Sequence, residues 1–276
     1  MLFHRIPWSV AGRLTRQPLK REPLRWFSTQ LGEKIKVAIV GSGPSGCYTA
    51  KYLKAAVEDT VKLKIDVIEK LPTPFGLVRS GVAPDHPDVK NVQNDFSALF
   101  EDKESISFLG NVCVGQDVSL EELRELYDVV VLAYGCQSDR KLGIPGEDSL
   151  SGILCAREFV AWYNGHPEFD HVGEIVASAL SSGGADDPGQ ATVVVVGQGN
   201  VALDCARILA KGRSGLMHTD ITSRSLNVLQ EGVKQTVVVG RRGHVQASFT
   251  IKVGSPHGFI HVDMHRVLTS FDTGTS

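Results

Sequence analysis

The stretch Val37–Lys54, "VAIVGSGPSGCYTAKYLK", decides the fold of this chain. It leads from an apolar segment through a glycine-rich turn into a segment with helical spacing. The segment Ile35–Val40 is apolar apart from Lys36, which is typical of a parallel strand buried on both faces. The turn Gly41–Gly46 fits the pattern G-x-G-x-x-G, and we expect the following helix to reach about Ala56. Strand, turn and helix in this order predict a dinucleotide-binding unit.

We name the turn Gly41–Gly46 the first cradle, and each of its glycines has a physical task. Gly41 permits a tight turn out of the strand, Gly43 lets the backbone approach a pyrophosphate, and Gly46 allows close packing of helix on strand. The helix N-terminus adds unpaired N–H donors and the positive end of a dipole. The next strand, Leu63–Glu69, ends in an acid that can accept hydrogen bonds from an adenosine ribose and would repel a 2′-phosphate. These features alone do not distinguish FAD from NAD.

The same pattern returns at Val193–Gly212, "VVVVGQGNVALDCARILAKG". Here Gly197–Ala202 forms the variant G-x-G-x-x-A, in which alanine still allows close packing of helix on strand. Gln198 and Asn200 can also donate hydrogen bonds to phosphate. We name Gly197–Ala202 the second cradle, and the chain therefore contains two predicted dinucleotide-binding turns.

The residues that follow the next strand differ between the two cradles. Strand Thr236–Val239 leads to Arg241 and Arg242, where the first cradle has Glu69. Paired guanidinium groups can bind a 2′-phosphate in bidentate fashion, so the second cradle is expected to prefer NADP. Two cradles with opposite preferences predict hydride transfer between NADPH and FAD.

Further segments with strand or helix patterns surround the cradles. We expect helices at Asp88–Phe100, Leu120–Leu126 with a Ser119–Glu122 capping box, Ala156–Tyr163 and Asp220–Leu229. Short strands are expected at Ile106–Leu109 and Val112–Val114, and a buried strand at Tyr127–Tyr134. Loops are expected at Lys70–Pro87, 136–152 and 165–190. The predicted fold class is α/β, with two doubly wound Rossmann-like dinucleotide-binding units, both incomplete for lack of a C-terminal half.

The first thirty residues differ in composition from the rest of the chain. They hold six basic side chains and one acid, interspersed with large apolar residues. This composition resembles a mitochondrial transit peptide; a disordered basic arm on a cytosolic protein is the alternative. The remainder of the chain is net acidic, which argues against nucleic acid as a partner. No apolar run approaches the length of a transmembrane segment.

The five cysteines are scattered, without a C-x-x-C pair. This spacing argues against a flavin disulfide reductase, which needs two closely spaced cysteines. The tail residues His257, His261 and His265 are spaced four apart, but Pro256 and Gly258 disfavour the helix that would gather them. We therefore predict no metal site.

Several longer motifs make a family resemblance specific. They include "GSGPSGCYTAKYL", "PFGLVRSGVAPDHPDVKNV", "AREFVAWYNGHPE", "GQGNVALDCARIL" and "VGRRGHVQASFTIK". Together they resemble the mitochondrial NADPH:adrenodoxin (ferredoxin) oxidoreductases, and the likeness covers residues 28–252. The resemblance implies a flavoprotein that takes hydride from NADPH onto FAD. It also implies single-electron transfer to an acidic [2Fe–2S] ferredoxin of the adrenodoxin type, which serves cytochromes P450 and iron–sulfur assembly in the mitochondrial matrix. Peripheral association with the inner membrane is compatible with this picture.

The resemblance also implies roles for individual residues. FAD would be contacted by Ser45, Glu69, Leu77 and Val114, in addition to the glycines of the first cradle. NADP would be contacted by Gln198, Gly199, Asn200, Val201, Arg241 and Arg242. The loop Phe75–Pro87 would lie near the flavin ring. Within it, Asp85 and His86 have either a flavin-side polar role or a structural role in the turn, and we favour the structural role. No catalytic acid or base is expected, since hydride transfer depends on alignment.

The chain also departs from the family. Members are much longer and carry a Glu where this chain has Val253, and the segment Val253–Ser276 looks unrelated to them. The predicted division is a presequence at 1–30, an FAD-binding part at 31–136, a partial NADP-binding part at 137–252 and a divergent tail at 253–276. Three hypotheses follow: a complete small reductase, a truncated form or fragment of one that lacks catalysis, and a non-enzymatic NADP-binding module. We favour the truncated form.

Overall fold

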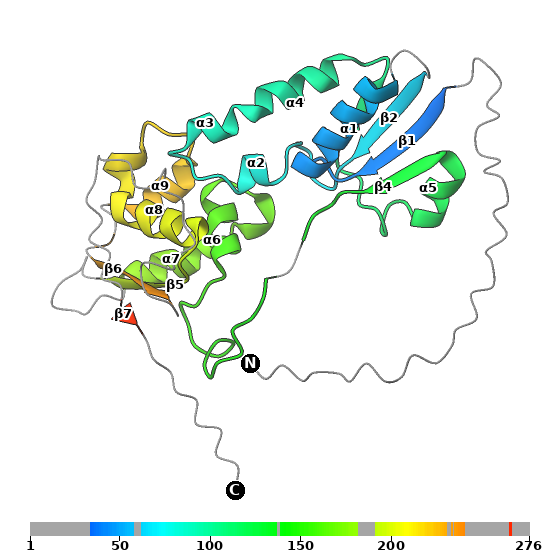
Figure 1. Ribbon diagram of the computed structural model, residues 1–276. Helices are drawn as coiled ribbons and strands as arrows, with labels where there is room; N and C mark the ends of the chain where they lie inside the picture. The colour runs from blue at the N-terminus through cyan, green and yellow to red at the C-terminus, as the bar shows by residue number, and fades with distance from the viewer. Residues whose placement is uncertain are drawn as a thin grey trace, which may run out of the picture. The chain divides into compact units, whose positions relative to one another are not determined.

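The computed structural model describes residues 34–57, 62–136, 139–181, 191–230, 233, 235–240 and 265–266. The predicted presequence, Arg241, Arg242 and most of the predicted tail lie outside these residues, and of the tail only the backbone of 265–266 is described. The helices and strands alternate in two successive groups, each built around a parallel sheet (Figure 1). The predicted α/β class with Rossmann-like parallel sheets is confirmed.

The first sheet has the strand order β3-β2-β1-β4. Its strands are β1 (Ile35–Val40), β2 (Leu63–Ile68), β3 (Ile106–Leu109) and β4 (Val129–Leu132), and all described pairings are parallel. The apolar segment that opens the chain's first cradle thus forms a central strand. This order places the chain reversal beside β1, where ligands of such sheets bind.

Helices cover both faces of the first sheet (Figure 1). They are α1 (Pro44–Val57), α4 (Val92–Glu101) and α5 (Leu120–Leu126). Two short helices, α2 (Leu77–Ser80) and α3 (Pro87–Lys90), lie in the segment between β2 and α4. On one face Val37 and Ile39 pack with residues of α1 and α4, whereas on the other Ala38 and Val40 pack with Leu123 of α5. Consecutive residues of β1 are therefore buried on opposite faces, which explains why the strand does not alternate in polarity.

Local signals account for the helix boundaries in this group. Pro44 begins α1, where its missing N–H costs nothing. Ser119 accepts a hydrogen bond from the Glu122 amide, and the Glu122 carboxylate accepts one from the Ser119 amide, so the predicted capping box is confirmed. The predicted helix Asp88–Phe100 is divided into α3 and α4 at Asn91, which itself keeps right-handed helical dihedral angles.

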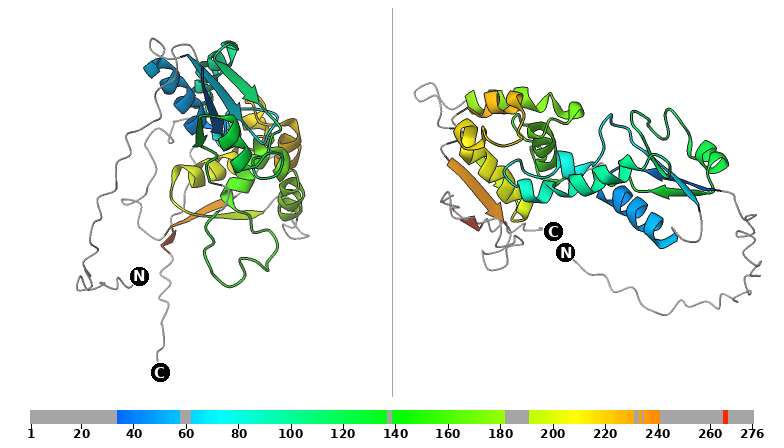
Figure 2. Two further views of the ribbon diagram at one scale, coloured as in Figure 1. Left: turned by 90° about the vertical axis from the view of Figure 1, so that its right-hand side faces the viewer. Right: turned by 90° about the horizontal axis from the view of Figure 1, so that it is seen from above.

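The second group contains a smaller sheet of order β5-β6-β7, which shares one apolar core with the helices of the group. Its elements are α6 (Ala156–Tyr163), η2 (Pro167–Phe169), α7 (Val172–Ser181), β5 (Thr192–Val196), α8 (Asn200–Leu216), α9 (Ser223–Leu229), β6 (Gln235–Gly240) and β7 (His265–Arg266). Its core contains Trp162 and Tyr163 of α6 together with Ile208 and Leu216 of α8. Figure 2 shows α8 alongside β6.

Four predictions for individual segments are wrong. The expected loop Lys70–Pro87 contains the single helical turn α2. The expected loop 165–190 contains α7, because Val172 and Val176 are buried against the core around Trp162. Val112–Val114 forms no strand; Val114 makes only an isolated bridge with Val118. The strand β4 is not buried on both sides, since Val129 and Leu132 are exposed at the sheet edge.

No described helix combines the length and apolar composition needed to cross a membrane.

Candidate functional site

The first cradle joins the end of β1 to the start of α1. Gly41 has a φ of 104°, and a Cβ there would lie 2.5 Å from the carbonyl oxygen of Ala133. A Cβ on Gly46 would overlap the carbonyl oxygen of Gly41. By contrast, a Cβ on Gly43 would meet no heavy atom within 4 Å. Gly41 and Gly46 are therefore required by the fold, whereas Gly43 leaves its backbone open to a ligand.

Glu69, directly after β2, is held against this cradle by hydrogen bonds. Its Oε2 accepts from the Ser42 amide at 3.0 Å and from the Ser42 hydroxyl at 2.7 Å. Its Oε1 accepts from the Leu71 amide at 3.2 Å. Ser42 is buried, so the carboxylate is fixed in place by a backbone that cannot easily move. A carboxylate has about four lone-pair sites, which leaves capacity for a ribose hydroxyl.

The loop after Glu69 returns to the same cradle. The Phe75 amide donates to the Ser42 carbonyl at 3.1 Å, and a Cβ on Gly76 would lie 3.0 Å from the Gly43 Cα. Leu77 follows at once, and its side chain is 64% exposed. Phe75 has a φ of 89° although it is not glycine, and its ring is buried against Phe96. Backbone strain of this kind persists only where the surrounding packing enforces it, and it is common at ligand sites.

The other residues expected at this cradle lie on both sides of it. Ser45 is exposed in the first turn of α1. Val114 follows Val112, whose amide donates to the Glu69 carbonyl at 3.0 Å. Val114 itself packs against the core beneath β1. The structure therefore brings Ser45, Glu69 and Leu77 to the cradle, and it brings the segment of Val114 alongside the backbone of Glu69.

The second cradle joins the end of β5 to the start of α8. The Gly197 amide donates to the Val239 carbonyl at 2.8 Å, which closes the turn onto β6. Gly197 has a φ of 147°, and a Cβ there would lie 3.5 Å from the Ala202 Cβ. A Cβ on Gly199 would meet nothing within 4 Å. Both cradles thus leave the second glycine open, at the N-terminus of a long helix that offers N–H donors.

The side chains expected to bind phosphate surround this second cradle. Asn200 and Val201 are exposed in the first turn of α8. The Gln198 side chain lies over Gly240, because a Cβ on Gly240 would overlap its Cδ. Gln198 therefore reaches the end of β6, immediately before Arg241 and Arg242. Those two arginines lie outside the described residues, so their contribution stays a prediction.

None of the cysteines is joined to another in a disulfide. All five are unpaired, and Cys47 and Cys205 are buried. Burial raises the pKa of each of these two thiols to about 12, so both stay protonated at neutral pH. Among the described residues there is also no cluster of three or more His, Cys, Asp or Glu residues that could hold a metal ion.

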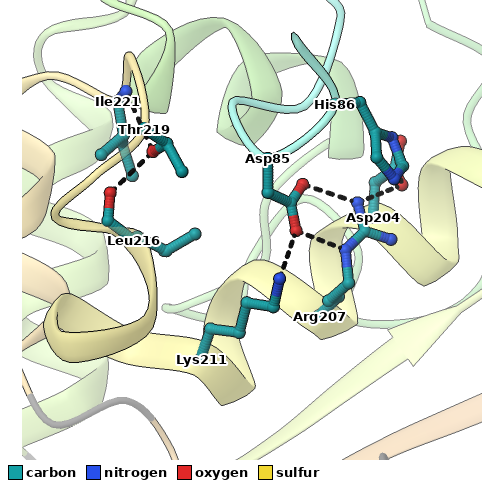
Figure 3. Close-up of polar contacts among 8 residues, drawn as sticks. All are labelled: Asp85, His86, Asp204, Arg207, Lys211, Leu216, Thr219 and Ile221. Atoms are coloured by element: carbon teal, nitrogen blue, oxygen red, sulfur yellow. Dashed lines mark hydrogen bonds and ion pairs between the residues drawn. The ribbon is translucent and has the colours of Figure 1, made fainter. Parts of the chain in front are cut away.

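A set of charged residues on α8 was not anticipated from the sequence. Asp204, Arg207 and Lys211 lie near Asp85 of the loop that follows α2, and the Asp85 carboxylate contacts both cations (Figure 3). The spacing of the α8 residues at i, i+3 and i+7 places them on one helix face, which the sequence does reveal. Their partner is more than a hundred positions away, and no local pattern connects it to them.

Comparisons with known proteins place these features in a family. The sequence model of the family described as "Pyridine nucleotide-disulphide oxidoreductase" matches residues 35–238. The mitochondrial NADPH:adrenodoxin oxidoreductase of Arabidopsis thaliana is 51% identical over 229 residues, which are 83% of this chain and 44% of that protein. The enzyme of the same name from Mus musculus is 44% identical over 91% of this chain and 48% of that protein.

A solved structure of a related reductase also resembles this chain. The structure described as Mycobacterium tuberculosis FprA in complex with NADPH is 46% identical, with a TM-score of 0.72. The match covers 80% of this chain and 46% of the FprA chain. The chain spans less than half the length of these relatives. The family model nevertheless covers most of the chain, and the chain therefore belongs to the pyridine nucleotide-disulphide oxidoreductase family.

Proposed function

We propose that the chain binds FAD at its first cradle and NADP(H) at its second, as part of a reductase that passes electrons from NADPH to a ferredoxin. The observation that carries this proposal is the pairing of two open cradles with different residues at the end of the next strand. At the first, Ser42 fixes the Glu69 carboxylate, which suits an unphosphorylated ribose. At the second, the sequence places Arg241 and Arg242, which suit a 2′-phosphate. The names of relatives as NADPH:adrenodoxin oxidoreductase and NADPH-ferredoxin reductase support the same function.

The residues of each cradle fit the group proposed for it, because Gly43 and Gly199 leave room for a pyrophosphate. FAD is assigned to Gly41, Gly43, Ser45, Gly46, Glu69, Leu77 and Val114. NADP is assigned to Gln198, Gly199, Asn200, Val201, Arg241 and Arg242. Bound there, FAD would supply a hydride acceptor for NADPH and a group able to release electrons singly. The contribution of this chain is to hold and align the two nucleotides, for which no catalytic acid or base is needed.

The partner and location are proposed at a finer level than the comparisons reach. We assign the electron acceptor to the [2Fe–2S] ferredoxins of the adrenodoxin type and the location to the mitochondrial matrix, with peripheral contact to the inner membrane. The basic segment 1–30 supports import into mitochondria. The proposed division places FAD binding in residues 31–136 and NADP binding in residues 137–252, with a divergent tail at 253–276.

A second candidate is a chain that binds nucleotides without turnover. One observation favours it: within the described residues, Val194 and Val196 on one face of β5 are 56% and 61% exposed. A doubly wound sheet normally has a covering layer on both faces. The chain also spans less than half the length of these relatives.

One experiment separates these candidates. The full chain is purified, its visible absorbance is recorded for bound flavin, and NADPH-dependent reduction of cytochrome c through an added ferredoxin is measured. Stoichiometric FAD with turnover is expected for the reductase. Nucleotide binding without turnover supports the second candidate. A soluble chain that binds neither FAD nor NADP+ would contradict both.

The assignment of Arg241 and Arg242 is tested by replacing both with alanine. A hydrogen bond to a charged group contributes about 1.5–3 kcal/mol. The affinity for NADP+ is therefore expected to fall at least about tenfold, while the affinity for NAD+ changes little. Isothermal titration with both nucleotides measures the two values. Arg224→Ala, which removes an exposed arginine of α9 paired with Asp170, serves as the control and should leave both affinities unchanged. An unaltered preference for NADP+ in the double variant contradicts the assignment.

A further inference from the structure

The segment Val82–Lys90, which we name the bridge segment, links the first group of elements to the second. The Asn164 side-chain amide donates to the Val82 carbonyl at 3.0 Å, and Lys90 donates to the Asn164 side-chain oxygen at 3.1 Å. Lys90 also pairs with Asp220 at 2.7 Å, and its side chain is only 10% exposed. Both ends of the bridge segment are thus held at the C-terminal end of α6.

The centre of the bridge segment is Asp85, which makes a bidentate ion pair with Arg207 of α8 (Figure 3). Arg207 Nε donates to Asp85 Oδ2 at 2.7 Å, and Arg207 Nη2 donates to Oδ1 at 2.9 Å. Lys211 donates to Asp85 Oδ2 at 2.8 Å, and Arg207 Nη2 also reaches Asp204 at 2.7 Å. The Asp85 and Arg207 side chains are 7% and 9% exposed. Two carboxylates and two cations therefore balance one another in charge, with Asp85 and Arg207 buried and Lys211 36% exposed.

The pair is costly to break because both partners are buried. Removing one partner of a buried ion pair leaves an uncompensated charge, which destabilises far more than loss of an exposed pair. Burial by itself would raise the pKa of Asp85, but the hydrogen bonds from Arg207 and Lys211 lower that pKa well below its usual range. Asp85 is thus ionised at every physiological pH, and the pair is a constant feature of the fold.

Each partner of this pair is connected along the chain to one of the cradles. The chain reaches Asp85 from Phe75, whose amide contacts Ser42 of the first cradle, through the single turn α2. Arg207 lies two turns along α8 from Asn200, where that helix opens the second cradle. An α-helix is stiff over two turns. Holding Arg207 in place therefore fixes the direction of the N-terminus of α8.

We propose that Asp85 is a positioning residue: its ion pair with Arg207 ties the loop that closes the first cradle to the helix that opens the second, and so sets the alignment of the two nucleotides. The inference rests on the proposed function for its effect on electron transfer. It does not rest on that function for the mechanical link, which can be measured in the chain without nucleotides. Asp85 thus acts through α8 and need not touch either nucleotide.

The mechanical link is tested by Asp85→Asn in the full chain, with hydrogen exchange of backbone amides measured by mass spectrometry. Exchange in the bridge segment and in the first two turns of α8 is expected to accelerate at least about tenfold. Asp170→Asn is the matched control, because Asp170 pairs with Arg224 at an exposed site. The double variant Asp85→Asn/Arg207→Gln should exchange no faster than Asp85→Asn alone, since both changes break one link. If amides of α8 exchange in Asp85→Asn as slowly as in the wild type, the proposal is overturned.

The effect of Asp85 on the alignment of the two nucleotides is tested by a measurement that distinguishes misalignment from loss of structure. For Asp85→Asn, FAD content and the affinity for 2′,5′-ADP should stay within about twofold of the wild type, while the rate of flavin reduction by NADPH falls at least about tenfold. If the affinity for 2′,5′-ADP falls by the same factor as the rate of flavin reduction, Asp85 is not a positioning residue. If Asp85→Asn does not fold, Arg207→Lys, which keeps the charge but loses the bidentate geometry, is read in the same way. A wild-type chain without flavin reduction would refute the proposed function, and the exchange measurement would still decide whether Asp85 holds α8.

Discussion

Gly46→Ala is expected to lower the free energy of unfolding by about 3 kcal/mol or more and to abolish FAD binding. The added Cβ would overlap the carbonyl oxygen of Gly41 and would lie 3.3 Å from Cγ2 of Ile39. Neither neighbour can move easily. Gly41 is itself confined by the carbonyl of Ala133, and Ile39 is fully buried in the central strand. The clash must therefore push α1 away from β1, which removes the close packing on which the first cradle depends. Urea unfolding and the flavin content of the purified protein measure the two effects.

Gly43→Ala is the control for this prediction. A Cβ at Gly43 meets no heavy atom within 4 Å, so its effect on the free energy of unfolding should stay below about 1 kcal/mol. The two variants add the same methyl group three residues apart, in the same turn. Unfolding of both at the same urea concentration would show that close packing of α1 on β1 does not require glycine at position 46.

The cradles could be predicted from the sequence because every signal for them is local. Gly41–Gly46 and Gly197–Ala202 each follow an apolar strand segment directly and precede a helix segment directly. The structure places α1 and α8 immediately after the second glycine in both cases, as expected. The Ser119–Glu122 capping box could be predicted for the same reason, since its two residues are three positions apart.

The features that were missed depend on residues distant in sequence. Helix α7 contains Gly173 and two serines, so its intrinsic helix propensity is poor. It forms because Val172 and Val176 are buried against α6 and α9, and a Cβ on Gly173 would lie only 2.9 Å from the Trp162 indole nitrogen. Tertiary packing thus overrides propensity at this position.

The polar contacts of the candidate site could not be predicted either, because they join residues that are distant in sequence. The sequence indicated that Glu69 would end a strand beside the cradle, but it did not indicate that Ser42 would hold its carboxylate. Likewise, Asp85 was recognised as a polar residue of a proline-rich turn, whereas its partner Arg207 lies 122 positions away. Such pairings are determined by how the two groups of elements pack, and a single sequence carries no local trace of that packing.

Gly199→Val is expected to weaken NADP+ binding by on the order of 100-fold while leaving the fold intact. Gly199 has a φ of −102° and a ψ of 177°, an extended conformation that valine adopts without strain. Its Cβ would point into space with no heavy atom within 4 Å, so stability should change by less than about 1 kcal/mol. The same open space is where a pyrophosphate must approach the α8 N-terminus, and the valine methyl groups would occupy it.

Isothermal titration with NADP+ and urea unfolding test both parts of this expectation. Gly43→Val is the reciprocal control, because Gly43 is the equivalent open position of the first cradle. It should eliminate bound FAD and leave NADP+ affinity within about threefold of the wild type, whereas Gly199→Val should do the reverse. If Gly199→Val binds NADP+ as tightly as the wild type, the second cradle does not hold the pyrophosphate. If each variant loses both nucleotides, the two cradles are not independent sites, and the division of FAD and NADP between them must be abandoned.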